Sequence, residues 1–117
     1  MLAILTALSL LGSPQESREN LDFFESKIRP VLVEKCYRCH NSVHKKKADL
    51  ALDYRDGLLS SGGIVPGAPE KSPIIAAIRH EGDQEPMPFQ APKLAKIVIK
   101  DYEEWIRRGA HAPRDAR

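Results

Sequence analysis

Two cysteines and a histidine stand together in the sequence Cys36-Tyr37-Arg38-Cys39-His40. Cys-x-x-Cys-His is the pattern through which c-type haem is attached to a polypeptide. In that chemistry the two thiols add to the two haem vinyl groups, and the adjacent imidazole becomes an axial ligand of the iron. Cys36 and Cys39 are the only cysteines in the chain, so no thiol is left over. The motif predicts one covalent haem c per chain, held by Cys36 and Cys39, with His40 as an iron ligand.

A Cys-x-x-Cys pair also occurs in structural zinc sites, in thiol redox pairs and in disulfides. A structural zinc site needs four ligands, and the chain has no second Cys-x-x-Cys pair. A redox pair needs a thiolate at the start of a helix, whereas this pair follows a helical stretch. A disulfide would leave His40 unexplained, and so short a loop would constrain the unfolded chain little. These arguments favour haem attachment.

Met87 is a candidate for the second axial ligand, since it is the only methionine after the first residue. Prolines on both sides keep its segment from coiling into a helix, so the thioether can approach iron from a loop. Two alternatives remain open. Met87 could fill a gap in the core, as methionine often does, and His80 or His111 could be the ligand instead.

The composition is that of one small domain that needs help from a cofactor. The chain has 117 residues, of which 42% are hydrophobic and 6% aromatic. A core built from these side chains alone would be thin, and domains of this size often depend on a cofactor, a metal or disulfides. The net charge of +2, from 18 basic and 16 acidic residues, gives no indication of nucleic-acid binding. The sequence contains no paired carboxylates, Ser/His/Asp set or phosphate loop, so we expect an electron carrier and not an enzyme.

The chain begins with an apolar run over residues 1–12, followed by a polar segment. The run is too short to span a bilayer and is typical of the apolar part of a signal peptide, although no basic residue precedes it. We therefore predict a signal peptide and short spacer at residues 1–17, one domain at 18–111, and a tail or truncated linker at 112–117. The protein is expected to be exported, in the periplasm or elsewhere outside the cytoplasm, with no stable membrane insertion after removal of the signal.

Helices are expected on both sides of a loop-rich centre. Apolar residues recur at helical spacing between Leu21 and Leu32 and stop just before the cysteine motif, with Pro30 predicted to kink or divide that helix. A last helix is predicted from Leu94 or Ile97 to Arg108, closed by Gly109. Its apolar stripe comprises Val98, Tyr102, Trp105 and Ile106, of which Tyr102 and Trp105 should pack against Phe24.

Shorter elements are predicted in the centre. Residues 54–60 should form one helical turn, and residues 64–69 an extended segment with a turn. Ser72 and Pro73 read as the N-cap and first position of a short helix that buries Ile74, Ile75 and Ile78. Residues 85–89 are expected to form a loop.

The order of these pieces resembles the planctomycete-type cytochrome c domain, within the class I cytochrome c superfamily. The resemblance extends from Phe23 to about Ala110. The matching segments are residues 24–32, 36–40, 45–47, 64–72, 87–88 and 105–110. It implies an all-α, cytochrome c-like helical fold wrapped around one covalent haem, with Met87 opposite His40 on the iron. The last helix departs from the family pattern, because Ala95 stands where a capping side chain is usual.

These observations predict a monohaem c-type cytochrome that transfers single electrons through His/Met-ligated iron. The alternative is a haem-binding structural or sensory module of a larger exported protein. The expected partner is another redox protein. Lys45, Lys46 and Lys47 are either a solvated loop or a docking patch for an acidic face of that partner. Arg38, Arg55 and Arg79 are candidate partners for the haem propionates.

Overall fold

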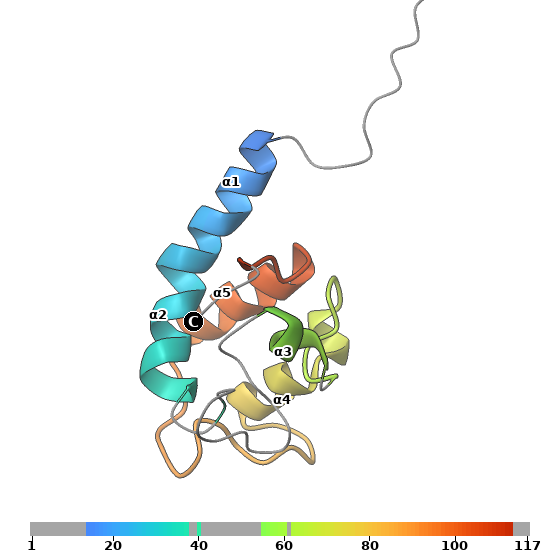
Figure 1. Cartoon of the computed structure of the whole chain (residues 1–117). Coiled ribbons are helices and arrows are strands. Elements are labelled where there is room, and N and C mark those ends of the chain that lie inside the picture. The colour runs from blue at the N-terminus through green and yellow to red at the C-terminus, as the bar shows by residue number, and fades with distance from the viewer. Residues whose placement is uncertain (1–13, 38–39, 41–54, 61, 114–117) are drawn as a thin grey trace, which may run out of the picture.

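The structure, a computed structural model, describes residues 14–37, 40, 55–60 and 62–113. This part of the chain contains helices and no strand, which confirms the predicted all-α class (Figure 1). The α-helices are α1 (Pro14–Phe23), α2 (Arg29–Val31), α3 (Arg55–Ser60), α4 (Pro73–Arg79) and α5 (Lys96–Arg107). Within the described residues, no helix has the length and apolar character needed to cross a membrane.

The first helical stretch is continuous and includes two π-helical segments, Phe24–Ile28 and Leu32–Cys36, on either side of α2. Pro30 has no N–H and its ring displaces the carbonyl one turn earlier, which favours a wider turn. Accordingly, the Arg29 N–H bonds to Phe24 O, five residues back. The proline therefore widens the helix and does not end it. The helix also starts at Pro14, four residues before the predicted start of the domain.

The wider turns keep one row of side chains on the core. Phe24, Ile28 and Leu32 are four residues apart and each is 0% exposed. In a regular α-helix of 3.6 residues per turn, a row with this spacing would drift steadily around the axis. A π-helical turn contains more residues, so it offsets the drift. The helix thus presents three fully buried residues to the core, where it meets one neighbouring helix, before it reaches Cys36.

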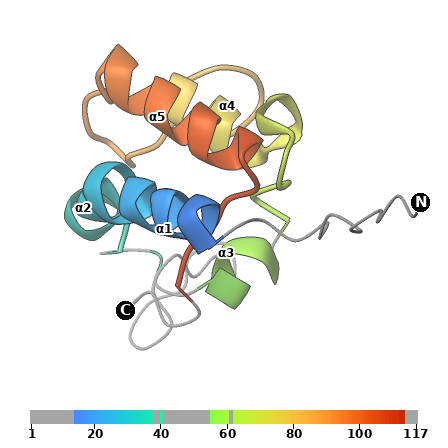
Figure 2. The same cartoon turned by 90° about the horizontal axis from the view of Figure 1, so that it is seen from above.

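That neighbour is α5, which lies between the first helical stretch and α4 (Figure 2). The Trp105 ring centroid is 5.8 Å from that of Phe24 and 5.9 Å from that of Tyr102, the latter pair edge to face. The Tyr102 hydroxyl donates to Ile28 O at 3.0 Å. These contacts confirm the predicted packing of Trp105 against Phe24, whereas Tyr102 packs against Trp105 and bonds to Ile28. The buried residues of α5 are Ile99, Tyr102, Trp105 and Ile106, with Val98 only half-buried.

The hydrogen bonds at the two ends of α5 follow from the residue types found there. At the start, Ala95 makes no side-chain capping bond, as its methyl group requires. At the end, the Gly109 N–H donates to Ile106 O and the Ala110 N–H to Trp105 O, the paired bonds of a Schellman motif. Gly109 has a φ of 110°, which a side chain would disfavour. The predicted closure at Gly109 is confirmed.

The short helix α4 buries Ile74, Ile75 and Ile78, as predicted. Ser72 occupies the predicted N-cap position, but its side chain makes no capping bond to the helix. The Ser72 hydroxyl instead accepts from the Val65 N–H at 2.8 Å and donates to Ala68 O at 2.9 Å. Ser72 therefore occupies the N-cap position as predicted, but the expected hydrogen bond from a helix N–H to its hydroxyl does not form. The buried hydroxyl stabilises the preceding turn instead.

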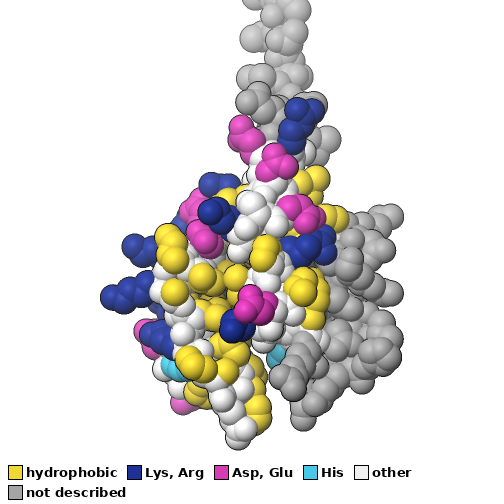
Figure 3. Space-filling model, turned by 90° about the vertical axis from the view of Figure 1, so that its left-hand side faces the viewer, with side chains coloured by type: hydrophobic (Ala, Val, Ile, Leu, Met, Phe, Trp, Pro, Cys, Tyr) yellow, Lys and Arg dark blue, Asp and Glu magenta, His cyan; other side chains and the backbone are white. Residues whose placement is uncertain are grey.

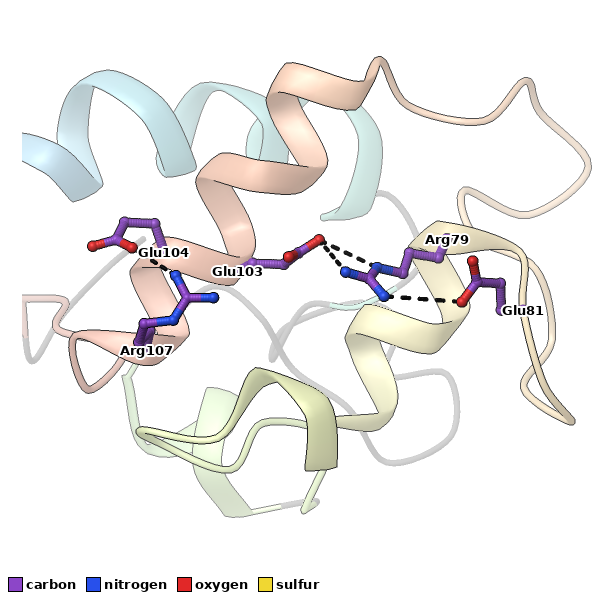
Figure 4. A network of polar contacts seen from close by, with 5 residues as sticks. All are labelled: Arg79, Glu81, Glu103, Glu104 and Arg107. Carbon is purple, nitrogen blue, oxygen red and sulfur yellow. Dashed lines mark hydrogen bonds and ion pairs between the residues drawn. The ribbon is translucent and has the colours of Figure 1, made fainter.

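An ion pair joins α4 to α5 (Figure 4). Arg79 at the end of α4 donates to Glu103 of α5 at 2.6 Å, and it lies 4.0 Å from Glu81. The hydrogen bond with Glu103 raises the pKa of Arg79 above its ordinary value. Glu103, half-buried on α5, therefore links the two helices.

On the face of the molecule shown in Figure 3, hydrophobic side chains gather in the middle and lower part. Acidic and basic side chains are mixed around them and along α1, so neither sign of charge dominates this face. Several predictions lie outside the described residues, namely those for residues 1–13, the 45–47 lysines and residues 114–117. The tail and signal assignments stay predictions.

Candidate functional site

The cysteine motif begins where the first helical stretch ends. Cys36 is the last residue of the second π-helical segment, and the next residue, Tyr37, donates its N–H to Leu32 O at 2.8 Å. The His40 N–H donates to Cys36 O at 3.0 Å. This bond joins the first and last residues of the motif. Cys39 and Arg38 lie outside the described residues.

His40 is enclosed by the protein. Its side chain is 7% exposed, and only Ser72 among the other polar residues of the described part is similarly buried. The side chain of Cys36 is half-buried and packs against the hydrophobic core formed by Phe24, Trp105 and their neighbours. The first cysteine of the motif thus lies at the border of the apolar interior, and the histidine of the motif is buried.

Met87 contacts the same core from a segment that is far from Cys36 in the sequence. It lies in the predicted loop after α4, and its half-buried side chain packs against the core cluster that Cys36 also contacts. Both backbone polar groups of Met87 are bonded. Its N–H donates to Ala77 O at 3.0 Å, and its carbonyl oxygen lies 3.0 Å from Nε2 of His80. The structure therefore brings two predicted haem residues, Cys36 and Met87, to one hydrophobic cluster.

The rival histidines are placed differently from His40. His80 is exposed, and its ring is engaged with the Met87 carbonyl. His111 is also exposed, and its backbone carbonyl accepts the indole N–H of Trp105 at 2.9 Å. Among the residues that the structure describes, no group of three or more His, Cys, Asp or Glu side chains could hold a metal ion.

The role of His80 was not predicted from the sequence, which offered it only as an alternative ligand. One signal was present. His80 follows the last residue of α4, a position where glycine is the usual choice because the backbone turns left-handed, and the nearest glycine comes two residues later. A bulky residue at such a position suggests that its side chain makes a contact that offsets the cost of the left-handed backbone.

Comparison with known proteins supports the haem interpretation of the motif. Residues 36–89 match the family model described as planctomycete cytochrome C. This stretch of the chain is similar to that family. The match starts at Cys36 and ends two residues after Met87, so the attachment motif and the proposed sulfur ligand both lie inside it. The resemblance predicted from the sequence is confirmed there, although it was expected to reach from Phe23 to Ala110. No curated protein and no solved structure matches the chain.

The described residues around the motif and Met87 fit a haem. An imidazole that is 7% exposed and a thioether packed on apolar side chains are the donor set of His/Met cytochromes. A half-buried thiol four residues before the imidazole fits covalent attachment. By contrast, the depression beside α5 is unsuited to an apolar macrocycle, because charged side chains line it: Lys100, Asp101, Glu103, Glu104 and Arg107.

Of the three arginines predicted as partners of the haem propionates, Arg79 is already paired within the chain. The Arg79 guanidinium is paired with Glu103 and Glu81, so its charge is already balanced by carboxylates of the chain. Arg38 lies outside the described residues, as does the side chain of Arg55. These two remain candidates from the sequence alone.

Proposed function

We propose that this chain carries one haem c, bound covalently through Cys36 and Cys39 and ligated by His40 and Met87, and that it transfers single electrons. The observation that carries the proposal is the buried imidazole of His40, whose backbone N–H donates to Cys36 O, within a stretch that matches a cytochrome c family. A buried histidine directly after a Cys-x-x-Cys pair has its simplest explanation as the proximal ligand of an attached haem.

The haem iron, when bound, supplies the ferric and ferrous states between which an electron carrier cycles. The chain's residues provide attachment, ligation and exclusion of water. The sulfur atoms of Cys36 and Cys39 hold the group at the end of the first helical stretch. Burial of His40 keeps bulk water away from the imidazole. The thioether of Met87, as a soft neutral ligand, favours the reduced state and raises the reduction potential relative to a second histidine.

The test is whether the haem is covalent. After export with the maturation machinery, the denatured chain should keep a mass increase equal to one haem in mass spectrometry. A matched Cys36→Ala/Cys39→Ala variant, exported in the same way, should lack it. A mature parent chain with two thiols that react with an alkylating agent, and with no added mass, would contradict the proposal. Zinc bound to that sample would support the zinc alternative.

The visible spectrum of the same sample distinguishes electron transfer from the sensory alternative. Six-coordinate, low-spin iron supports an electron carrier, because both axial positions are then filled by the protein. Five-coordinate iron with an open position would favour a sensory or structural module and would count against the ligation proposed for Met87.

We further propose that the carrier works outside the cytoplasm and meets an acidic face of its redox partner. The apolar run at residues 1–12 supports export. Residues 45–47 are three lysines in a row, and exposed charges act over about 8 Å at physiological ionic strength. Electron-transfer rates of a variant with all three lysines changed to Gln should fall at low salt and converge with the parent at high salt. Equal rates at low salt would leave these lysines as a solvated loop.

A further inference from the structure

His80 has a backbone conformation that its residue type does not favour. It caps the C-terminal end of α4 with φ 57° and ψ 42°, in the left-handed region. Non-glycine residues adopt this region infrequently because the β-carbon approaches the following carbonyl oxygen. Its N–H donates to Ala77 O at 3.1 Å, so the left-handed turn is built into the end of the helix. Such strain persists where surrounding contacts hold the residue.

The contact that holds His80 is with Met87. The ring nitrogen Nε2 lies 3.0 Å from the Met87 carbonyl oxygen. A carbonyl oxygen can only accept, so Nε2 carries the hydrogen and donates it. The Met87 N–H donates in turn to Ala77 O. One side-chain bond and one backbone bond therefore fasten Met87 to the last turn of α4.

This attachment links Met87 to a rigid part of the molecule. The helix α4 is fixed by Ile74, Ile75 and Ile78 in the core, and by the Arg79–Glu103 ion pair to α5. The Met87 loop itself has mostly exposed residues, with Glu85, Pro86 and Phe89 all open to solvent. The two bonds thus add to the packing of the half-buried Met87 side chain in holding this backbone at one place.

We propose that His80 is a positioning residue, whose Nε2–H bond to the Met87 carbonyl holds the thioether at the iron against competing ligands. The inference rests on the proposed function, since it needs Met87 as the axial ligand. It also accounts for a histidine at a position that suits glycine. His80 is exposed and engaged with the Met87 backbone, which fits a support for the ligand better than the ligand itself.

The test is a titration of the ferric holoprotein with imidazole, which displaces the thioether and removes the weak long-wavelength sulfur-to-iron absorption. His80→Gly removes the ring and keeps a left-handed backbone. Gln90→Gly is the matched control, because Gln90 lies in the same loop with φ 51° and also gains a favourable glycine. His80→Gly should lower the half-displacement concentration of imidazole by about two- to tenfold, the effect of losing one hydrogen bond. Gln90→Gly should stay near the parent.

Hydrogen exchange gives a second measurement that does not depend on the iron. The Met87 amide, which donates to Ala77 O, should exchange faster in His80→Gly than in Gln90→Gly. Equal titrations and equal exchange in the two variants would overturn the positioning role and leave the proposed function intact. A parent protein without the sulfur-to-iron absorption would instead overturn His/Met ligation, and the role of His80 with it.

Discussion

Met87 is held by its backbone as well as by the packing of its side chain. The N–H and carbonyl of this residue bond to Ala77 and His80, and the thioether packs on the same apolar cluster as Cys36. This anchoring would serve the axial ligand that we propose, because a functional side chain must be held close to one place.

Replacing Met87 should therefore change the iron without releasing the haem. We expect Met87→Ala to lose the long-wavelength sulfur-to-iron absorption and to lower the reduction potential, because the soft sulfur ligand is gone. Covalent haem should remain, since attachment depends on Cys36 and Cys39. Absorption spectra and redox titration of the purified variant are the measurements. If the spectrum and potential were those of the parent, the ligand would be another residue, and His80→Ala and His111→Ala would be examined next.

Tyr102 gives a prediction about alkaline pH. Burial raises the pKa of the Tyr102 phenol well above its ordinary value, and the hydroxyl donates to Ile28 O. The folded state thus keeps the proton when the unfolded state loses it, at about pH 10. The contribution of the protonated Tyr102 phenol to the free energy of unfolding is fully present below about pH 10. It is lost as the pH rises towards the higher pKa of the folded state.

Tyr102→Phe tests that sign. At about pH 8 the variant should be less stable than the parent by about 1 kcal/mol, the usual contribution of one hydrogen bond. Above about pH 10 the parent should lose stability by up to about 1.4 kcal/mol per pH unit relative to the variant, so the gap should narrow. Urea unfolding at several pH values measures both. A gap that stays constant with pH would mean that Tyr102 ionises equally in the folded and unfolded states.

At the scale of elements, the sequence predicted the helices well and their internal geometry poorly. The buried positions around Phe24, the turn of helix at residues 55–60 and the closure at Gly109 all follow from spacing and residue type. The two π-helical segments do not, because periodicity shows that a helix forms but not how a proline is accommodated within it. Pro30 was expected to kink or divide the helix near Arg29. In the structure a π-helical segment ends at Ile28, α2 begins at Arg29, and the helical stretch continues to Cys36.

The sequence predicted the parts of the candidate site that consist of a short motif or a distinctive residue type. It did not predict the contacts between residues that only the fold brings together. The cysteine motif and Met87 could be named from the sequence. The bond from His80 to Met87 O could not, since it depends on the path of the loop after α4. The pairing of Arg79 with Glu103 is a similar case, because it requires the relative placement of two helices.

The start of α5 offers a gain in stability. Ala95 has the extended backbone of an N-cap, with φ −61° and ψ 149°, but its side chain cannot accept a hydrogen bond. Ala95→Ser should stabilise the protein by about 0.5 to 2 kcal/mol, because the hydroxyl would accept from a free N–H of the first turn. Urea unfolding measures the change. Ala91→Ser, an exposed alanine outside the helix, is the control and should change stability by less than about 0.5 kcal/mol. Equal effects of the two substitutions would show that no cap forms at residue 95.

At the scale of the whole molecule, few residues carry the core of the described part. Its largest fully buried side chains are Phe24, Ile28, Leu32, Tyr102, Trp105 and Ile106, all from the first helical stretch and α5. Cys36 and Met87 pack against this core from separate segments of the chain. A cofactor bound by them would add apolar contact to a small core, which is the expected role of haem in a domain of this size.

Loss of the haem should therefore destabilise the fold as a whole. A buried aromatic side chain contributes up to about 3 kcal/mol, and a haem is larger than any side chain. Because about 1 kcal/mol shifts the melting temperature of a domain this size by roughly 4 to 8 °C, the haem-free chain should melt more than about 12 °C below the holoprotein. Two haem-free samples separate the haem from the cysteines: the parent chain made without haem maturation, and the Cys36→Ala/Cys39→Ala variant. Thermal melts followed by circular dichroism should show melting temperatures that are lowered equally in both haem-free samples. Haem-free chains that melted with the holoprotein would show that haem is no part of the core, and a drop in the variant alone would assign the stability to the cysteine side chains.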